Sequence, residues 1–268
     1  MNKKMKKIFG IAIVFAFTTL ITWIYAGYAY SWGPFGKLHY VKVRRMSGNA
    51  EKYCFDNIER LENSILDNKD VLFLGSSVTY GAASLQEAMP EYFEKRFGCI
   101  STKEAVSGTT LVDNRPDSYV SRLKHNVDTS VDYKLVICQL STNDATRKEP
   151  LGELSGSFDM DSFDTSTVTG AIEFIIAYCR KNWDCPVMFY TGSRYESEEY
   201  ALMVDRLFEI SKKWGIEVLD LWSDSEFNDI SDADRALYMS DPIHPTKAGY
   251  MEWWCPELER QLLEKYAD

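Results

Sequence analysis

The amino-acid sequence predicts an α/β protein: a single three-layer αβα domain with a five-stranded parallel sheet, preceded by one N-terminal transmembrane helix. Five short apolar runs alternate with segments of helical period along most of the chain, which is the pattern of a parallel sheet covered by helices on both faces. The chain has 268 residues, 45% hydrophobic and 26% charged. This composition gives room for one large domain and excludes a disordered chain, a collagen and a small disulfide-rich scaffold.

The first element is the uncharged segment 8–30. As a helix it would be about 34 Å long, enough to cross a bilayer core of about 30 Å. Aromatic side chains gather at its far end, as in an interfacial belt; they are Trp23, Tyr25, Tyr28, Tyr30 and Trp32. The alternative is a cleaved signal peptide, but those have apolar cores of about 7 to 15 residues and a small-x-small cleavage site. No convincing site follows here, because Ile24 lies two positions before Ala26, so we expect an anchor.

Basic residues flank the segment on both sides. Residues 1–7 hold four lysines and no acid, which predicts a cytoplasmic N-terminus, a signal anchor at 8–30 in the cell membrane, and an extracytoplasmic domain. A second basic group, from Lys37 to Arg45, lies in the juxtamembrane neck of residues 31–50. It weakens this orientation, although it could instead contact anionic headgroups from the outer side.

Residues 51–268 show no repeat, low-complexity tract or Gly/Ser linker, so we interpret them as one domain. The expected strands are 70–75, 99–107, 133–141, 186–192 and 216–222, and the expected helices are 84–97, 117–126, 165–183, 195–214 and 246–266. Ligands on parallel sheets bind at the carboxyl ends of the strands. The residues that follow each strand are therefore the place to look for chemistry.

Charge and cysteine content limit the partners. Residues 46–268 carry 22 basic and 40 acidic residues, and such an acidic body repels phosphate backbones, so no nucleic acid partner is expected. The six cysteines and three histidines form no CxxC pair or ligand cluster, which argues against a metal site; no cofactor is expected. Cys138 is expected in the core, whereas Cys179 and Cys185 flank a helix-to-strand connection that a disulfide could close.

Three strand ends carry turn-forming and polar residues. The first run is followed by GSSVTYG at 75–81, where glycines permit a tight turn that presents a serine. The second is followed by Ser107-Gly108-Thr109, which can bring a backbone N–H close to a ligand, and the third by Ser141-Thr142-Asn143-Asp144. Each loop taken alone is more typical of an ordinary turn.

The segment before the last expected helix changes this interpretation. Asp241-Pro242-Ile243-His244-Pro245 places a carboxylate and an imidazole three residues apart in a rigid turn. His39, in the basic neck, and His125, at a solvated helix end, have no such neighbour. Together with a serine, a glycine N–H and an asparagine at consecutive strand ends, the pair supplies every part that acyl transfer requires.

With these four blocks in order, the sequence resembles the SGNH hydrolases, also called the GDSL esterase and lipase family, over essentially all of residues 66–266. GSSVTYG matches GDSxTxG, AVSG the glycine block, STND the GxND block, and DPIHP the DxxHP block. The resemblance implies a flavodoxin-like three-layer fold and the activity of a serine hydrolase acting on carboxylic esters.

The resemblance also implies a role for each matching residue. Ser77 would be the nucleophile, His244 the general base and acid, and Asp241 the carboxylate that orients the imidazole. The backbone N–H groups of Ser77 and Gly108 and the side-chain amide of Asn143 would form the oxyanion hole. Ser76 stands where the family usually has aspartate, so its position in the turn, and not its residue type, selects Ser77 as the nucleophile.

The sequence departs from the family pattern at two further places. Ser141 replaces the glycine of GxND, and Lys103-Glu104-Ala105 stands where many members have Asn-x-Gly. Neither departure removes a catalytic group. Both alter the pocket wall or the freedom of the backbone, so the resemblance does not identify the substrate. Asp144 is expected to brace its loop. The long segment 147–165 is interpreted either as a rim or lid of the pocket or as a floppy acidic insertion.

Three functions are consistent with these residues. The first is an extracytoplasmic, membrane-anchored serine esterase that removes acetyl or other short acyl groups from a small-molecule or carbohydrate ester. The second uses the same triad as an acyltransferase in cell-surface polymer acylation, with a membrane acyltransferase as partner. The third is a non-catalytic surface binding module, which the complete set of catalytic groups disfavours.

Overall fold

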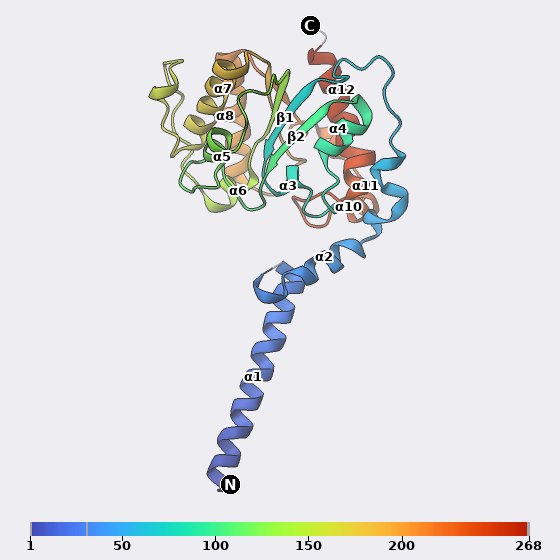
Figure 1. Ribbon diagram of the computed structural model, residues 1–268, viewed down its shortest axis with the longest axis vertical. Helices are drawn as coiled ribbons and strands as arrows, with labels where there is room; N and C mark the ends of the chain where they lie inside the picture. The colour runs from blue at the N-terminus through green and yellow to red at the C-terminus, as the bar shows by residue number, and fades with distance from the viewer. Residues whose placement is uncertain (1, 31, 267–268) are drawn as a thin grey trace.

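The computed structural model describes residues 2–30 and 32–266. It confirms the predicted fold class: five parallel strands form one sheet in the order β2-β1-β3-β4-β5, with helices on both faces (Figure 1). The strands are β1 (Asp70–Gly75), β2 (Ile100–Ala105), β3 (Leu135–Gln139), β4 (Val187–Tyr190) and β5 (Glu217–Leu219). Each lies inside its expected range, and all but β1 are shorter than expected.

Alternating side chains of the central strands divide the core into two layers. On one face Leu72 and Val136 pack with α5 (Tyr119–His125), α7 (Val168–Trp183) and α8 (Glu198–Trp214). On the other face Val71 and Leu135 pack with α4 (Met89–Phe97) and α12 (Cys255–Tyr266). Because both faces of these strands are buried, β1 and β3 are continuous apolar runs and not alternating ones.

The remaining helices are short and lie in the connections. They are α2 (Lys37–Arg44), α3 (Ser77–Tyr80), α6 (Thr142–Arg147), α9 (Ser225–Asn228), α10 (Asp232–Tyr238) and α11 (Lys247–Gly249). Single 3₁₀ turns are η1 (Gly33–Phe35), η2 (Ser47–Asn49), η3 (Glu51–Tyr53), η4 (Phe55–Asn57) and η5 (Met160–Ser162), and η6 (Tyr250–Trp254) is a π-helical turn before α12. The expected helix 246–266 is thus α11, η6 and α12 in succession.

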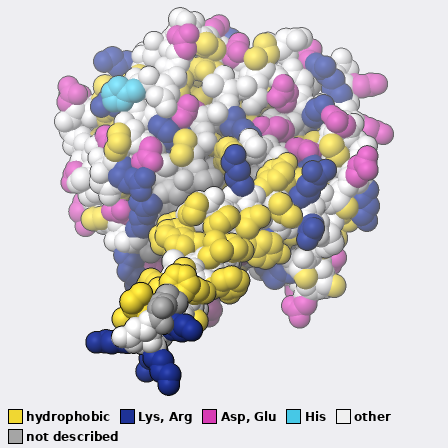
Figure 2. All heavy atoms as spheres, turned by 60° about the horizontal axis from the view of Figure 1, so that its bottom comes forward, with side chains coloured by type: hydrophobic (Ala, Val, Ile, Leu, Met, Phe, Trp, Pro, Cys, Tyr) yellow, Lys and Arg dark blue, Asp and Glu magenta, His cyan; other side chains and the backbone are white. Residues whose placement is uncertain are grey.

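The N-terminal helix α1 (Lys3–Tyr30) projects from the domain (Figure 1). Within Lys3–Tyr28, an 18-residue stretch has a mean hydropathy of 2.1 and no buried residue, so the helix has the length and composition of a membrane anchor or of a signal sequence. Figure 2 shows hydrophobic side chains along this helix and basic ones at its free end. Trp23 stacks on Trp32 at the other end; Ser31 and the side chain of Tyr30 lie outside the described residues.

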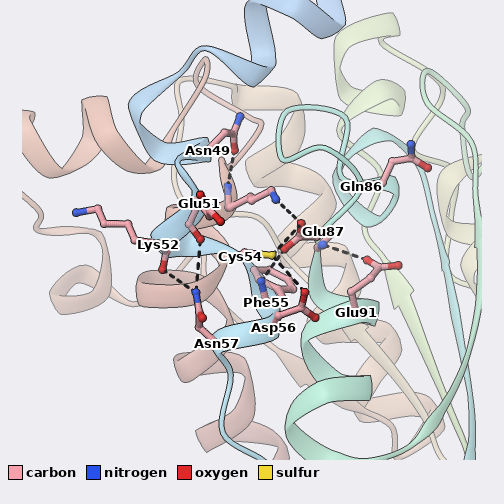
Figure 3. A network of polar contacts seen from close by, with 12 residues as sticks. Asn49, Glu51, Lys52, Cys54, Phe55, Asp56, Asn57, Gln86, Glu87 and Glu91 are labelled. Carbon is pink, nitrogen blue, oxygen red and sulfur yellow. Dashed lines mark hydrogen bonds and ion pairs between the residues drawn. The ribbon is translucent and has the colours of Figure 1, made fainter.

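The neck joins the domain through buried polar contacts (Figure 3). The side-chain amide of Asn49 donates to the carbonyls of Val43 and Ala83, at 2.8 and 2.9 Å, and accepts from the N–H of Lys247 at 2.9 Å. Glu87 accepts from the N–H of Phe55 at 2.7 Å and pairs with the ammonium of Lys247. Residues 43–57 are therefore fixed to two domain loops, one after α3 and one before α11.

The structure bears on two points that the sequence left open. Segment 147–165 is neither a lid nor floppy in its middle part, because Lys213 near the end of α8 donates to the carbonyls of Ser155 and Ser157 and pairs with the buried Glu173 of α7. The segment thus packs along α7 and α8 toward the amino ends of the strands. All six cysteines are free, including Cys179 and Cys185, so the structure does not contain the disulfide considered between them.

Candidate active site

The structure brings Ser77, His244 and Asp241 into one hydrogen-bonded chain. The Oγ of Ser77 lies 2.7 Å from Nε2 of His244, and Nδ1 of His244 lies 2.9 Å from both carboxylate oxygens of Asp241. A carboxylate only accepts, so Nδ1 carries the proton and Nε2 is left to accept the hydrogen bond of the serine hydroxyl. The chain thus runs from a hydroxyl through an imidazole, whose tautomer is fixed, to a carboxylate.

Ser77 is presented by a sharp turn between β1 and α3. A Cβ at Gly75 would lie 1.7 Å from the hydroxyl oxygen of Thr79, so this position requires glycine. Gly81 ends α3 with φ +79°, a left-handed conformation that glycine adopts without strain. The turn therefore depends on the two glycines that the sequence pattern singled out.

The neighbouring Ser76 is fully buried and points elsewhere. Its N–H donates to Oε1 of Gln139 at 3.0 Å, and its hydroxyl lies 3.4 Å from the same oxygen. Thr79 donates to this oxygen through its N–H, at 3.2 Å, and its hydroxyl, at 2.8 Å. Gln139 at the end of β3 thus fixes the residues on both sides of Ser77 in this turn; its sequence signal was a polar residue ending an apolar strand.

The Asp241–His244 turn is stabilised by the same carboxylate that orients the imidazole. Oδ1 of Asp241 accepts the N–H groups of Ile243 and His244, each at 2.9 Å. Partial burial acts to raise the pKa of Asp241, but the hydrogen bond and charge of His244 and these two N–H groups outweigh it and hold the pKa below its ordinary value. The carboxylate therefore stays ionised where the imidazole needs it.

The three groups expected to form an oxyanion hole lie on adjoining loops. Among the described residues, the N–H groups of Ser77 and Gly108 donate to no other group. Gly108 has φ +80°, and Arg147 donates to its carbonyl, which belongs to the following peptide unit, at 2.7 Å. Asn143 uses Nδ2 to donate to the carbonyl of Thr109 at 3.0 Å, which leaves the second hydrogen of this amide for a ligand.

Two residues at the start of α6 position Asn143. Ser141, the departure from the glycine of GxND, caps the helix by accepting the N–H of Asn143 at 3.2 Å. Asp144 accepts the N–H groups of Leu111 and Val112, at 2.8 and 3.1 Å, which ties α6 to the loop after Gly108. Burial raises the pKa of Asp144 to about 6, although these hydrogen bonds favour its charged form.

A buried arginine, missed by the sequence reasoning, connects the loops after β1 and β2. Arg122 is only 2% exposed and donates to the carbonyl of Gly75 at 2.7 Å, to the hydroxyl of Thr109 at 3.2 Å and to the carboxylate of Glu104 at 3.0 Å. These contacts place it between the turns that carry Ser77 and Gly108. Glu104, in the second segment that departs from the family pattern, is its charge partner.

An open groove of about 520 Å³ adjoins the acid of this chain. Asp241 and Pro242 form one wall, and the segment from Arg194 to Glu196 forms another. Arg235 and Asp232 of α10 supply charges of both signs. Apolar side chains, among them Ala236 and Met239, also line the groove.

Comparisons with known proteins agree with this arrangement. Residues 73–251 match the model of the GDSL-like lipase/acylhydrolase family. No curated protein has a sequence that matches the chain.

Solved structures share the fold at low sequence identity. A protein from Lactobacillus plantarum is 19% identical, with a TM-score of 0.60 over 75% of this chain and 97% of its own. A candidate GDSL-like lipase from Bacteroides ovatus is 15% identical, with a TM-score of 0.54 over 75% of this chain and 99% of its own. A family two carbohydrate esterase from Clostridium thermocellum, solved in complex with cellohexaose, is 17% identical, with a TM-score of 0.53 over 77% of this chain and 67% of its own.

Proposed function

The chain belongs to the GDSL-like lipase/acylhydrolase family and is a hydrolase, and from this premise we propose that it is a serine esterase in which Ser77, His244 and Asp241 form the catalytic triad. The observation that carries the proposal is the continuous chain of hydrogen bonds from the Ser77 hydroxyl through His244 to Asp241. Serine, imidazole and carboxylate in this order are the groups that acyl transfer to a hydroxyl requires.

In the proposed mechanism, Ser77 attacks the ester carbonyl while Nε2 of His244 takes its proton. The ionised Asp241 stabilises the imidazolium, which then protonates the leaving alcohol. The N–H groups of Ser77 and Gly108 and the side-chain amide of Asn143 stabilise the oxyanion, and each such donor contributes about 2.7 to 4 kcal/mol in the transition state. Water, activated by His244, releases the acid from Ser77.

For the substrate, we propose a short acyl ester, acetyl foremost, of a carbohydrate. The charged groove beside Asp241 supports a polar alcohol, since its walls carry Arg194, Arg235 and Asp232. The structural likeness to a carbohydrate esterase is in keeping with this, although at 17% identity it shows the fold alone.

For the location, we propose that residues 1–7 are cytoplasmic, 8–30 anchor the chain in the cell membrane, 31–50 form a juxtamembrane neck and 51–268 form the extracytoplasmic hydrolase domain. The apolar, exposed surface of α1 supports the anchor, and the four lysines before it support the orientation.

The test uses the full chain in detergent with a short activated ester such as 4-nitrophenyl acetate. Loss of a triad nucleophile costs on the order of 10⁶ in kcat, so Ser77→Ala should abolish hydrolysis. Ser76→Ala is the matched control and should keep most of it, because Ser76 contacts Gln139 and not His244. Equal loss in both variants, or retained activity in Ser77→Ala, would contradict the proposal.

The same assay separates hydrolysis from transfer. A transferase that uses the same triad would form the acyl-enzyme on Ser77 and release it slowly in water, and a sugar alcohol would accelerate the release. Mass spectrometry of the quenched protein measures the acyl-enzyme, and the esterase proposal requires that it turn over in water alone.

A further inference from the structure

A small cavity beside the candidate site collects most of the unpartnered polar groups of the core. In the described part of the chain, seven buried side-chain nitrogen or oxygen atoms have no hydrogen-bond partner. Four of them belong to residues that line one cavity of about 10 Å³: Gln139 Nε2, Ser193 Oγ, Tyr195 OH and Trp254 Nε1. Because an unpaired buried polar group is costly, this concentration points to a ligand.

The chemistry of these four groups defines what can occupy the cavity. The amide nitrogen of Gln139 is the atom left without a partner, because its oxygen accepts the backbone N–H groups of Ser76 and Thr79. Trp254 can only donate, and the hydroxyls of Ser193 and Tyr195 can donate or accept. No ionisable carboxylate or basic side chain lines the cavity within the described residues. The set therefore fits one neutral oxygen, and the volume is close to that of a single water site.

The position of the cavity connects it to the proposed reaction. Its walls include Val78, Thr142 and Ile243. Val78 directly follows Ser77 in the chain, Thr142 directly precedes Asn143, and Ile243 directly precedes His244. It also lies on the side of β3 and β4, away from the loop of Gly108. In the proposed reaction the carbonyl oxygen of the ester lies in the oxyanion hole and the leaving alcohol lies near His244. The remaining substituent of the carbonyl carbon, the acyl chain, can then extend toward the cavity.

We propose that the cavity is an acyl-selecting subsite for a neutral, hydrogen-bonding oxygen. When the acyl group is acetyl, a water molecule fills the subsite; when it is a hydroxyacyl group such as glycolyl, its hydroxyl replaces that water. A plain alkyl group of the same size displaces the water and leaves the four polar groups unpaired, so the enzyme rejects it. This inference rests on the proposed function, because it assumes an acyl group on Ser77.

The test compares glycolyl and propionyl esters of one alcohol, because these acyl groups differ only by hydroxyl in place of methyl. For the full-length wild type, kcat/KM should be at least about 10²-fold higher for the glycolyl ester, as expected where a site built for a hydroxyl rejects the analogue that lacks it. The double variant Ser193→Ala/Tyr195→Phe should lower this ratio about tenfold or more. Trp183→Phe removes an unpartnered buried N–H outside the cavity and should leave the ratio unchanged. A wild-type ratio near one, or an unchanged ratio in the double variant, overturns the inference while the esterase proposal stands.

A crystal structure of the wild type supplies a second readout that needs no activity. We expect an ordered water within hydrogen-bond distance of Gln139 Nε2 and Trp254 Nε1, and its loss or displacement in the double variant. A dry cavity overturns the inference even if the protein is an active esterase. If the wild type hydrolyses no ester, the proposed function fails, and the acyl-selecting role fails with it whether or not the water is present.

Discussion

The loops that carry Ser77 and Gly108 are held in place by buried residues that do not touch the proposed reacting atoms. Gln139 fixes the turn around Ser77, Asp144 fixes the loop beside Gly108, and Arg122 joins the two. All three are at most 2% exposed. Hydrogen bonds made by buried polar groups hold the groups that they join in a defined position.

Asp241 offers the sharpest single-residue prediction for the mechanism. In Asp241→Asn the amide oxygen can keep the contacts to the N–H groups of Ile243 and His244, but the carboxylate that stabilises the imidazolium is gone. We expect kcat to fall by about 10² to 10⁴ with little change in the unfolding midpoint. Asp205→Asn, at an exposed position of α8, is the control and should match the wild type. Unchanged kinetics in Asp241→Asn would place the orienting carboxylate elsewhere.

Asp144 predicts a pH dependence of stability. Burial raises the pKa of its carboxyl in the folded state to about 6, from the ordinary 3.8. Between these values the unfolded state loses the proton first, so the contribution of Asp144 to stability falls as pH rises from about 4 to about 6. The shift corresponds to about 3 kcal/mol.

Asp144→Asn tests this directly, because asparagine resembles the protonated carboxyl and does not titrate. Urea unfolding of both proteins between pH 4 and pH 7 should show the variant gaining up to about 3 kcal/mol relative to the wild type as pH rises. A constant difference across this range would mean that the two N–H groups keep the carboxyl ionised throughout.

Among the elements, the neck is more than a linker. Residues 43–57 contact the loops after α3 and before α11 through Asn49 and Glu87. Figure 1 shows α3, α10 and α11 at the end of the sheet nearest α2. The neck therefore meets the domain beside the two segments that carry Ser77 and His244.

Asn49 is the residue through which this docking can be broken. Asn49→Ala removes two donated hydrogen bonds and leaves the N–H of Lys247 unpaired, which should lower the free energy of unfolding by about 1 to 3 kcal/mol. Limited proteolysis should then cut within residues 43–57 faster than in the wild type. Asn57→Ala is the control, because Asn57 is exposed and its side-chain amide donates to the nearby carbonyls of Glu51 and Lys52. Equal proteolysis of all three proteins would show that the neck is held by other contacts.

Segment 147–165 illustrates how packing decides the role of an element. Its acidic and glycine-rich composition was consistent both with a lid and with a floppy insertion. In the structure, Lys213 lies against Phe158, Phe163 and Trp214 and also donates hydrogen bonds to backbone carbonyls of the segment. A cation enclosed by aromatic rings and carbonyl oxygens holds the segment onto α7 and α8.

On the scale of the whole molecule, charge and hydropathy are divided between the two ends of the chain. The apolar side chains along most of α1 are exposed, and an exposed apolar helix of this length is typical of a membrane anchor or of a signal sequence. The domain is acidic and contains the candidate site.

The proposed topology predicts the outcome of a protease experiment on intact cells. The full chain should remain in the membrane fraction after an alkaline wash, and external protease should digest the domain while cytoplasmic marker proteins stay whole. Lysed cells serve as the control for protease access. A protected domain would reverse the orientation, and a domain released into the medium without residues 8–26 would show that α1 is a cleaved signal sequence.

The sequence by itself determined the fold class, the strand positions and the family. Local patterns suffice for these, since apolar runs bounded by turn residues define parallel strands and four short motifs at their ends define the family. The sequence also predicted the candidate site residues, because each motif assigns a role to a fixed position within it. These residues are Ser77, Gly108, Asn143, Asp241 and His244. The catalytic roles of these residues stay predictions that the variants above test.

Only the tertiary structure decided which residues support and surround that set. Arg122 and Gln139 lie far along the chain from Ser77, and their contacts exist because α5 and β3 pack beside β1. The same holds for the neck, for Lys213 and for the cavity between Gln139, Ser193 and Trp254. Contacts between distant segments leave no periodic or motif signal in the sequence, since any polar residue in a plausible loop or strand end is a candidate until the chain is packed.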